Sequence, residues 1–147
     1  MSVQLVELTV DEVIGLNRKA ILDQVWRVPA STAKHVLRNR GGLEGCIGGV
    51  FMQLTAGYVH LPLEKMAGLL LYRIAQGQFF LDGNKRTAVL STFFFLGNNG
   101  HKLRMIRDQM NDLIWGFASP IDDPGAKPKY KEEDAVQYVF DNIMPVA

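Results

Sequence analysis

The residues best suited to chemistry lie between Phe80 and Thr87, in the segment Phe-Leu-Asp-Gly-Asn-Lys-Arg-Thr. An apolar run follows this segment, which is therefore predicted to begin a helix. The first turn of a helix has unpaired N–H groups and the positive end of the helix dipole, and both favour a bound phosphate. Gly83 lets a ligand approach the backbone closely. Because Lys85 and Arg86 oppose the dipole at this position, we expect a compensating anion beside them.

The same residues have a simpler interpretation. Asp82 and Gly83 are equally consistent with a turn in which Asp82 or Asn84 caps the helix. A β-hairpin turn is disfavoured because both flanking segments have helical patterns. A P-loop is disfavoured because Asn84 and Arg86 interrupt the Gly-Lys-Thr run and few strands are predicted to hold it. From these residues alone, anion binding and simple capping both stay open.

The elements that position this segment are predicted to be helices. Thr9 and Glu12 have the spacing of a capping box, and Gly77 has the position of a residue that ends a helix. Residues 87–96 are apolar nearly all round, which places their helix in the middle of the core. The predicted helices are 10–24, 43–52, 63–75, 84–98, 105–117 and 131–143, with a loop at 38–42 and one short extended piece at 59–61.

The composition indicates one globular domain over residues 1–147. Apolar residues form 48% of the chain, which is enough for a core. The formal net charge of +1 argues against a nucleic-acid binder and gives no attraction to an anionic membrane. Cys46 is the only cysteine, so we expect no intrachain disulfide and no CxxC metal site. The sequence contains no recognisable signal peptide or membrane span, and the expected location is the cytoplasm.

The run from Phe80 to Arg86 resembles the signature of the Fic/Doc (Fido) family, which is His-Pro-Phe, any residue, Asp or Glu, Gly-Asn, Gly or Lys, then Arg. Residues 8–13, 38–44, 63–75 and 99–103 also resemble the corresponding segments of Doc-like proteins, so the likeness covers 8–143. It is closer to Doc toxins than to the adenylyl-transferring Fic enzymes. The chain is short, and Lys85 stands where those enzymes usually have Gly.

This resemblance implies a fold and an activity. The fold would be an all-α Fido fold, with about six or seven helices around the buried helix 84–98 and a short β-hairpin flap within 45–61. The activity would use ATP and Mg²⁺ to phosphorylate or nucleotidylate a Ser or Thr hydroxyl of a target protein. In the Doc case that target would be a translation factor.

The resemblance also implies roles for individual residues. Asp82 matches the acidic residue that holds Mg²⁺, and Phe80 matches an anchor of the loop. Three backbone segments and two side chains would bind phosphate. They are the backbone of Gly83, Asn84 and Lys85, which forms an anion hole, and the side chains of Asn84 and Arg86.

Gln78 stands where the family has its catalytic His, and Phe79 replaces the Pro that follows. A carboxamide is not basic near neutral pH, and loss of a general base typically costs about 10²–10⁴ in rate. We therefore expect weak or absent activity; the alternative is a catalytically dead Fido domain that binds a nucleotide or a peptide. Three explanations stay open: Gln78 is natural, it is an engineered substitution, or another histidine acts as the base (His35, His60 or His101).

Other residues have weaker claims to a role. Glu44 is a candidate partner contact or a solvated helix carboxylate, and Trp26 and Trp115 are expected in the core or on a partner surface. Residues 93–95 are expected to pack, and the charged cluster 127–133 to lead into the last helix. The self-inhibiting pattern of many Fic proteins, Ser/Thr-x-x-x-Glu-Gly/Asn, is absent from the sequence. Kinship with Doc toxins therefore implies inhibition in trans by an antitoxin peptide or protein.

Overall fold

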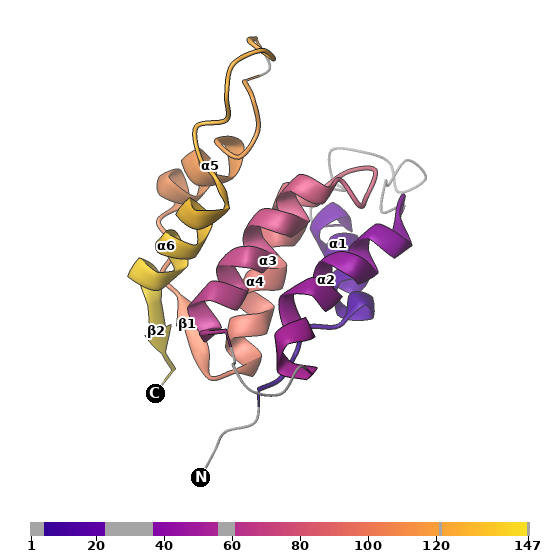
Figure 1. The fold of residues 1–147 in the computed structure, drawn as a ribbon, viewed down its shortest axis with the longest axis vertical. Helices are drawn as coiled ribbons and strands as arrows, with labels where there is room; N and C mark the ends of the chain where they lie inside the picture. Colours follow the sequence, from indigo (N-terminus) through magenta and orange to yellow (C-terminus); the bar gives the residue numbers. More distant parts are fainter. Residues whose placement is uncertain (1–4, 23–36, 56–60, 121, 147) are drawn as a thin grey trace.

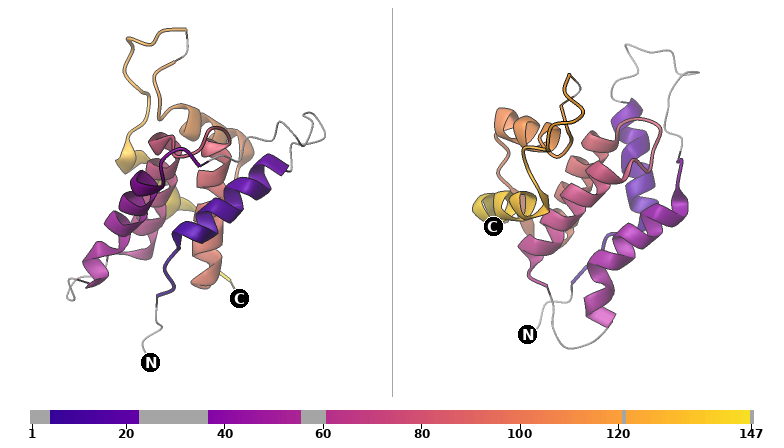
Figure 2. Two further views of the ribbon diagram at one scale, coloured as in Figure 1. Left: turned by 90° about the vertical axis from the view of Figure 1, so that its right-hand side faces the viewer. Right: turned by 45° about the horizontal axis from the view of Figure 1, so that its top comes forward.

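The computed structural model describes residues 5–22, 37–55, 61–120 and 122–146, which contain six helices and two short strands. Helices α3 and α4 lie in the middle, with α1 and α2 on one side and α5 and α6 on the other (Figure 1; Figure 2 gives two further views). In chain order the elements are α1 (Val10–Leu22), α2 (Arg40–Thr55), α3 (Leu63–Gly77), α4 (Asn84–Asn98), β1 (His101–Leu103), α5 (Arg107–Trp115), α6 (Glu132–Asn142) and β2 (Ile143–Pro145).

The pair α3 and α4 forms the centre of the core, as the sequence predicted. Helix α3 buries Leu70 and Ile74 completely, at the spacing of one apolar face. Helix α4 buries mostly small residues, such as Ala88 and Ser91, together with the ring of Phe95. Small buried side chains let neighbouring helices approach closely, so α4 contacts both α3 and α1. The prediction of an all-α fold around helix 84–98 is confirmed.

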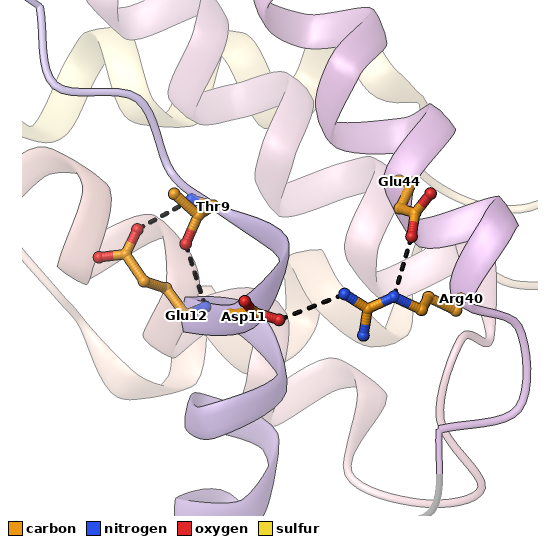
Figure 3. A network of polar contacts seen from close by, with 5 residues as sticks. All are labelled: Thr9, Asp11, Glu12, Arg40 and Glu44. Carbon is orange, nitrogen blue, oxygen red and sulfur yellow. Dashed lines mark hydrogen bonds and ion pairs between the residues drawn. The ribbon is translucent and has the colours of Figure 1, made fainter.

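A capping box begins α1, as predicted. The Thr9 N–H donates to Glu12 Oε1 at 2.8 Å, and the Glu12 N–H donates to Thr9 Oγ1 at 3.2 Å (Figure 3). The helix runs to Leu22, close to its predicted end at residue 24, which lies outside the described residues.

Helix α2 contradicts two predictions. It runs from Arg40 to Thr55, where we expected a loop at 38–42 and a β-hairpin flap within 45–61. The helix begins early because Asn39 Oδ1 accepts a 2.8 Å hydrogen bond from the Gly42 N–H. It continues because Leu43 and Ile47, four residues apart, bury one face in the core. The flap is therefore wrong over 45–55; residues 56–60, which include most of the extended piece predicted at 59–61, lie outside the described residues.

A two-stranded antiparallel sheet joins the far end of α4 to the end of the chain, and the sequence did not predict it. Residues of β1 pair with those of β2 in the register His101↔Pro145 and Leu103↔Ile143. The helices on either side are shorter than predicted: α5 covers 107–115 instead of 105–117, and α6 covers 132–142 instead of 131–143. Within the described ranges, every helix is too short or too polar to cross a bilayer.

Candidate functional site

The segment with the predicted chemistry forms the loop between α3 and α4 and the first turn of α4 (Figure 1). Phe80 is completely buried and forms an isolated β-bridge with Leu37. Next to it, the Phe79 carbonyl accepts hydrogen bonds from the N–H groups of Arg38 (2.7 Å) and Asn39 (3.2 Å). The loop is thus attached to the chain segment that leads into α2.

The side chain of Asn84 holds the loop from within. Its Oδ1 accepts from the Phe80 N–H at 3.0 Å, and its Nδ2 donates to the Phe80 carbonyl at 2.8 Å. Asn84 is only 8% exposed, so these two bonds satisfy backbone groups that water does not reach. Both polar atoms of this side chain are therefore engaged with the loop itself.

Asn17 of α1 holds the same loop from outside, and the sequence analysis missed it. Its Nδ2 donates to the Asp82 carbonyl and to Thr87 Oγ1, both at 3.0 Å, and the residue is fully buried. Its Oδ1 has no hydrogen-bond partner among the described residues. One signal was present in the sequence. Asn17 lies four residues after Val13 and three before Ala20, so it belongs to the apolar face of the helix.

Gly83 precedes α4 in the left-handed conformation, with φ 76°. An added Cβ there would meet Ile21 Cδ1 at 3.0 Å, so the position favours glycine twice over. Among the described residues, no side chain caps α4. Asp82 Oδ1 instead accepts the Gly83 N–H at 2.7 Å. The interpretation in which Asp82 or Asn84 caps the helix is therefore wrong, and the N–H groups of the first turn face outward without a side-chain acceptor from the described chain.

The two cations of the first turn border a groove between α4 and α5 of about 600 Å³. Lys85 Nζ lies 4.4 Å from the centre of the Trp115 ring, a cation–π contact between the two helices. Arg86 is exposed and also lines the groove. Trp115 is 59% exposed, so its predicted place in the core is wrong, whereas a partner surface stays a prediction.

Gln78 is exposed and ends α3 in the left-handed conformation, with φ 52° and ψ 41°. In the described part of the chain it is the only residue other than glycine with a positive φ. We predicted this role for Gly77, which is instead the last helical residue. Gly77 has a different reason to lack a side chain, because an added Cβ would lie 2.1 Å from the ring of Phe79. A left-handed residue other than glycine is costly and often marks a functional position.

Asp82 is the carboxylate nearest to the start of α4 in sequence, and it is exposed. The described residues contain no group of three or more His, Cys, Asp or Glu side chains placed to hold a metal ion. One carboxylate suits Mg²⁺ that arrives with phosphate, because this ion keeps several waters and is commonly held by one or two carboxylates plus phosphate oxygens. The residues present therefore fit a magnesium–nucleotide complex better than a resident metal ion.

The remaining candidates lie away from the loop or outside the described residues. His101 follows the opposite end of α4, a 15-residue helix that is about 22 Å long, and its Nδ1 lies 2.7 Å from the Asn99 carbonyl oxygen. Glu44 forms an exposed 2.9 Å ion pair with Arg40, which also contacts Asp11 at 3.3 Å (Figure 3). His35, His60 and Trp26 lie outside the described residues.

The two other segments singled out from the sequence are only partly as expected. In 93–95, Phe95 is buried but Phe94 is 37% exposed. The cluster 127–133 leads into α6 as predicted, and it is fixed by ion pairs from Lys129 to Asp112 (3.0 Å) and from Arg73 to Glu132 (2.7 Å).

Comparison with known protein families matches residues 7–96 to the Fic/DOC family. The matched range includes α1, α2, α3 and most of α4, and therefore the whole loop between α3 and α4. A search of curated proteins found no match to the chain.

Proposed function

The chain belongs to the Fic/DOC family, and on that premise we propose that it is a Doc-like, toxin-type protein transferase. In this proposal ATP and Mg²⁺ are used to modify a Ser or Thr hydroxyl of a target protein by phosphorylation or nucleotidylation. Protein modification by group transfer is the family's general activity. The finer assignment to Doc is supported by the short chain and by Lys85, which replaces the Gly of the adenylyl-transferring enzymes.

The start of α4 is the observation that carries this proposal. A left-handed glycine precedes it, no side chain of the described residues caps it, and Lys85 and Arg86 occupy its first turn. The backbone N–H groups of Gly83, Asn84 and Lys85 and the Arg86 guanidinium form the phosphate site. Phosphoryl transfer depends mainly on positioning and on neutralising charge, which such a site provides.

Two assignments within the site follow from the side-chain contacts. Asp82 holds Mg²⁺ through the carboxylate oxygen that does not accept from Gly83, and the bound ion neutralises phosphate charge. Asn84 binds phosphate mainly through its backbone N–H, because Phe80 engages both polar atoms of its side chain. Its one remaining Nδ2 hydrogen is the only side-chain donor left for phosphate.

Gln78 occupies the position of the family's general base in this assignment. Its carboxamide forms hydrogen bonds but cannot accept the proton of an attacking hydroxyl. Transfer by the chain as it stands is therefore weak or absent, whereas binding of nucleotide and Mg²⁺ is retained.

Thermal unfolding with and without ATP and Mg²⁺ tests the binding half of the proposal. A ligand at about 100 times its dissociation constant adds about 2.7 kcal/mol to the free energy of unfolding. We expect this stabilisation in the natural chain and its loss in Arg86→Ala, compared with Lys102→Ala, an exposed cation on β1, as a control. If no nucleotide stabilises the chain, the phosphate site does not exist.

Restoring the histidine tests the catalytic half. We expect Gln78→His to transfer label from ATP to a protein of the host extract, and to slow growth when expressed. Label from the γ-phosphate identifies phosphorylation and label from the α-phosphate identifies nucleotidylation. The double variant Gln78→His/Arg86→Ala is the control and should transfer nothing. Absence of labelling and of growth inhibition in Gln78→His would refute an enzymatic role for this loop.

The second candidate function is a catalytically dead Fido domain that binds a nucleotide or a peptide, and the carboxamide at position 78 favours it. Nucleotide stabilisation without any transfer by Gln78→His would support this candidate. For either function we propose an antitoxin peptide or protein as a partner in trans and, for the transferase, a translation factor as the target. A pull-down from native cells that recovers no small partner would count against the antitoxin.

A further inference from the structure

The groove between α4 and α5 has an apolar interior and begins at the phosphate site. Lys85 and Arg86 line it at the start of α4. Further along, Phe93 of α4 and Ile114 of α5 supply apolar surface. Its volume of about 600 Å³ is in the usual range of small-molecule sites. A ligand held at the start of α4 can therefore extend an apolar part into this groove.

The charges around the groove select the same kind of ligand. Its lining includes three cations, Lys85, Arg86 and Arg107, and none of the described lining residues is acidic. Asn111 supplies an uncharged amide that can both donate and accept hydrogen bonds. The groove is thus complementary to an anion that carries a flat, apolar group with polar edges.

Trp115 presents the flat surface that such a group needs. The indole is 59% exposed, and the ammonium of Lys85 lies over its ring. A bound nucleotide offers each partner a stronger contact. The ammonium gains a phosphate, and the ring gains a nucleobase, since bases of every kind stack on aromatic side chains.

We propose that the groove is the nucleobase subsite of the phosphate site and that Trp115 is its stacking platform. On binding, Lys85 moves from the ring to a phosphate, and the base takes its place on the indole. This inference rests on the proposed nucleotide function. An acidic amphipathic peptide has similar chemistry, but a nucleotide satisfies the phosphate site and the groove with one small molecule, because Lys85 and Arg86 belong to both.

The test compares two magnesium-bound ligands by isothermal titration calorimetry, ATP and inorganic tripolyphosphate, which lacks the base. We expect Trp115→Ala to weaken ATP binding at least tenfold and to change tripolyphosphate binding less than twofold. Trp115→Phe keeps a ring and should stay within threefold of the natural chain for ATP. Phe94→Ala removes an aromatic side chain of α4 that is 37% exposed and does not line the groove, and it should change neither ligand.

The outcomes separate the inference from the function on which it rests. If the natural chain binds tripolyphosphate as tightly as ATP, or if Trp115→Ala weakens both equally or neither, the groove holds no base, although the phosphate site stands. A peptide groove would give the last of these results. If the natural chain binds neither ligand, the phosphate site and the base subsite fail together.

Discussion

The substitution Asn84→Ala separates two roles for this side chain, support of the loop and contact with a ligand. In the structure its amide forms two hydrogen bonds with the backbone of Phe80, which is completely buried. Alanine leaves a buried N–H and a buried carbonyl without these partners, and each such group costs about 1–3 kcal/mol. Relaxation of the loop toward water lowers the sum, so we expect a loss of about 2–4 kcal/mol in the free energy of unfolding.

Urea unfolding without any nucleotide measures this loss. Asn98→Ala, at the exposed last position of the same helix, is the matched control and should change the free energy of unfolding by less than about 0.5 kcal/mol. A loss below about 1 kcal/mol in Asn84→Ala, together with abolished nucleotide binding, would refute our interpretation. It would show that the amide serves the ligand and that its bonds to Phe80 contribute little.

Three further predictions concern the surroundings of the site. Asn17→Ala should lower the free energy of unfolding by about 1–3 kcal/mol in urea titrations, because it removes the donor to the loop. Gly68→Ala should lower it by about 1–3 kcal/mol, since the new Cβ would lie 2.4 Å from the Val136 Cα, whereas Gly48→Ala, in open space on α2, should raise it by up to about 1 kcal/mol. Burial raises the pKa of the Cys46 thiol to about 11, against a smaller opposing effect of the Arg73 charge. Mass spectrometry should therefore show alkylation at pH 8 that is roughly 100-fold slower than that of the unfolded chain; equal rates would contradict this burial.

Local signals were sufficient for the elements that carry the site. The capping box at Thr9 and Glu12 marked the start of α1, because its two hydrogen bonds involve neighbouring residues only. The apolar spacing of α3 and the all-round apolar character of α4 placed both helices in the core. The position of Gly83, just before two cations, pointed to a helix start without a side-chain cap. These features depend on residues a few positions apart, which a sequence displays directly.

Helix α2 was mispredicted because its stability comes from distant contacts. Five glycines between residues 40 and 50 lower the helix propensity, and the same composition is typical of a loop. The helix forms because Leu43, Ile47, Val50 and Phe51 bury one face against the rest of the core. Most helical stability in proteins comes from such packing, which a local pattern does not reveal. The flap was a second error of this kind, since it was transferred from a family resemblance rather than derived from the residues.

The other features that sequence reasoning missed also join distant parts of the chain. Strands β1 and β2 have three residues each and lie about 40 positions apart, so neither has a recognisable period. Asn17 contacts residues 65 and 70 positions away. The groove beside Trp115 exists only because α5 packs near α4, and no motif in either helix announces it. The sequence therefore indicated which residues bind phosphate but not what holds them or what lies beside them.

The contacts of the loop have a consequence for the missing base. Phe80 and Asn84 fix the loop from within, and Asn17 fixes it from α1, whereas the side chain of Gln78 is exposed. The loop geometry thus does not depend on the side chain at position 78, only on its left-handed backbone. Histidine is one of the few residues other than glycine that are enriched in this conformation, and glutamine is not among them. The backbone therefore suits a histidine at least as well as the present residue. Restoring it requires no rearrangement of the loop, so any activity gained by Gln78→His reports the chemistry of the imidazole and not a repaired fold.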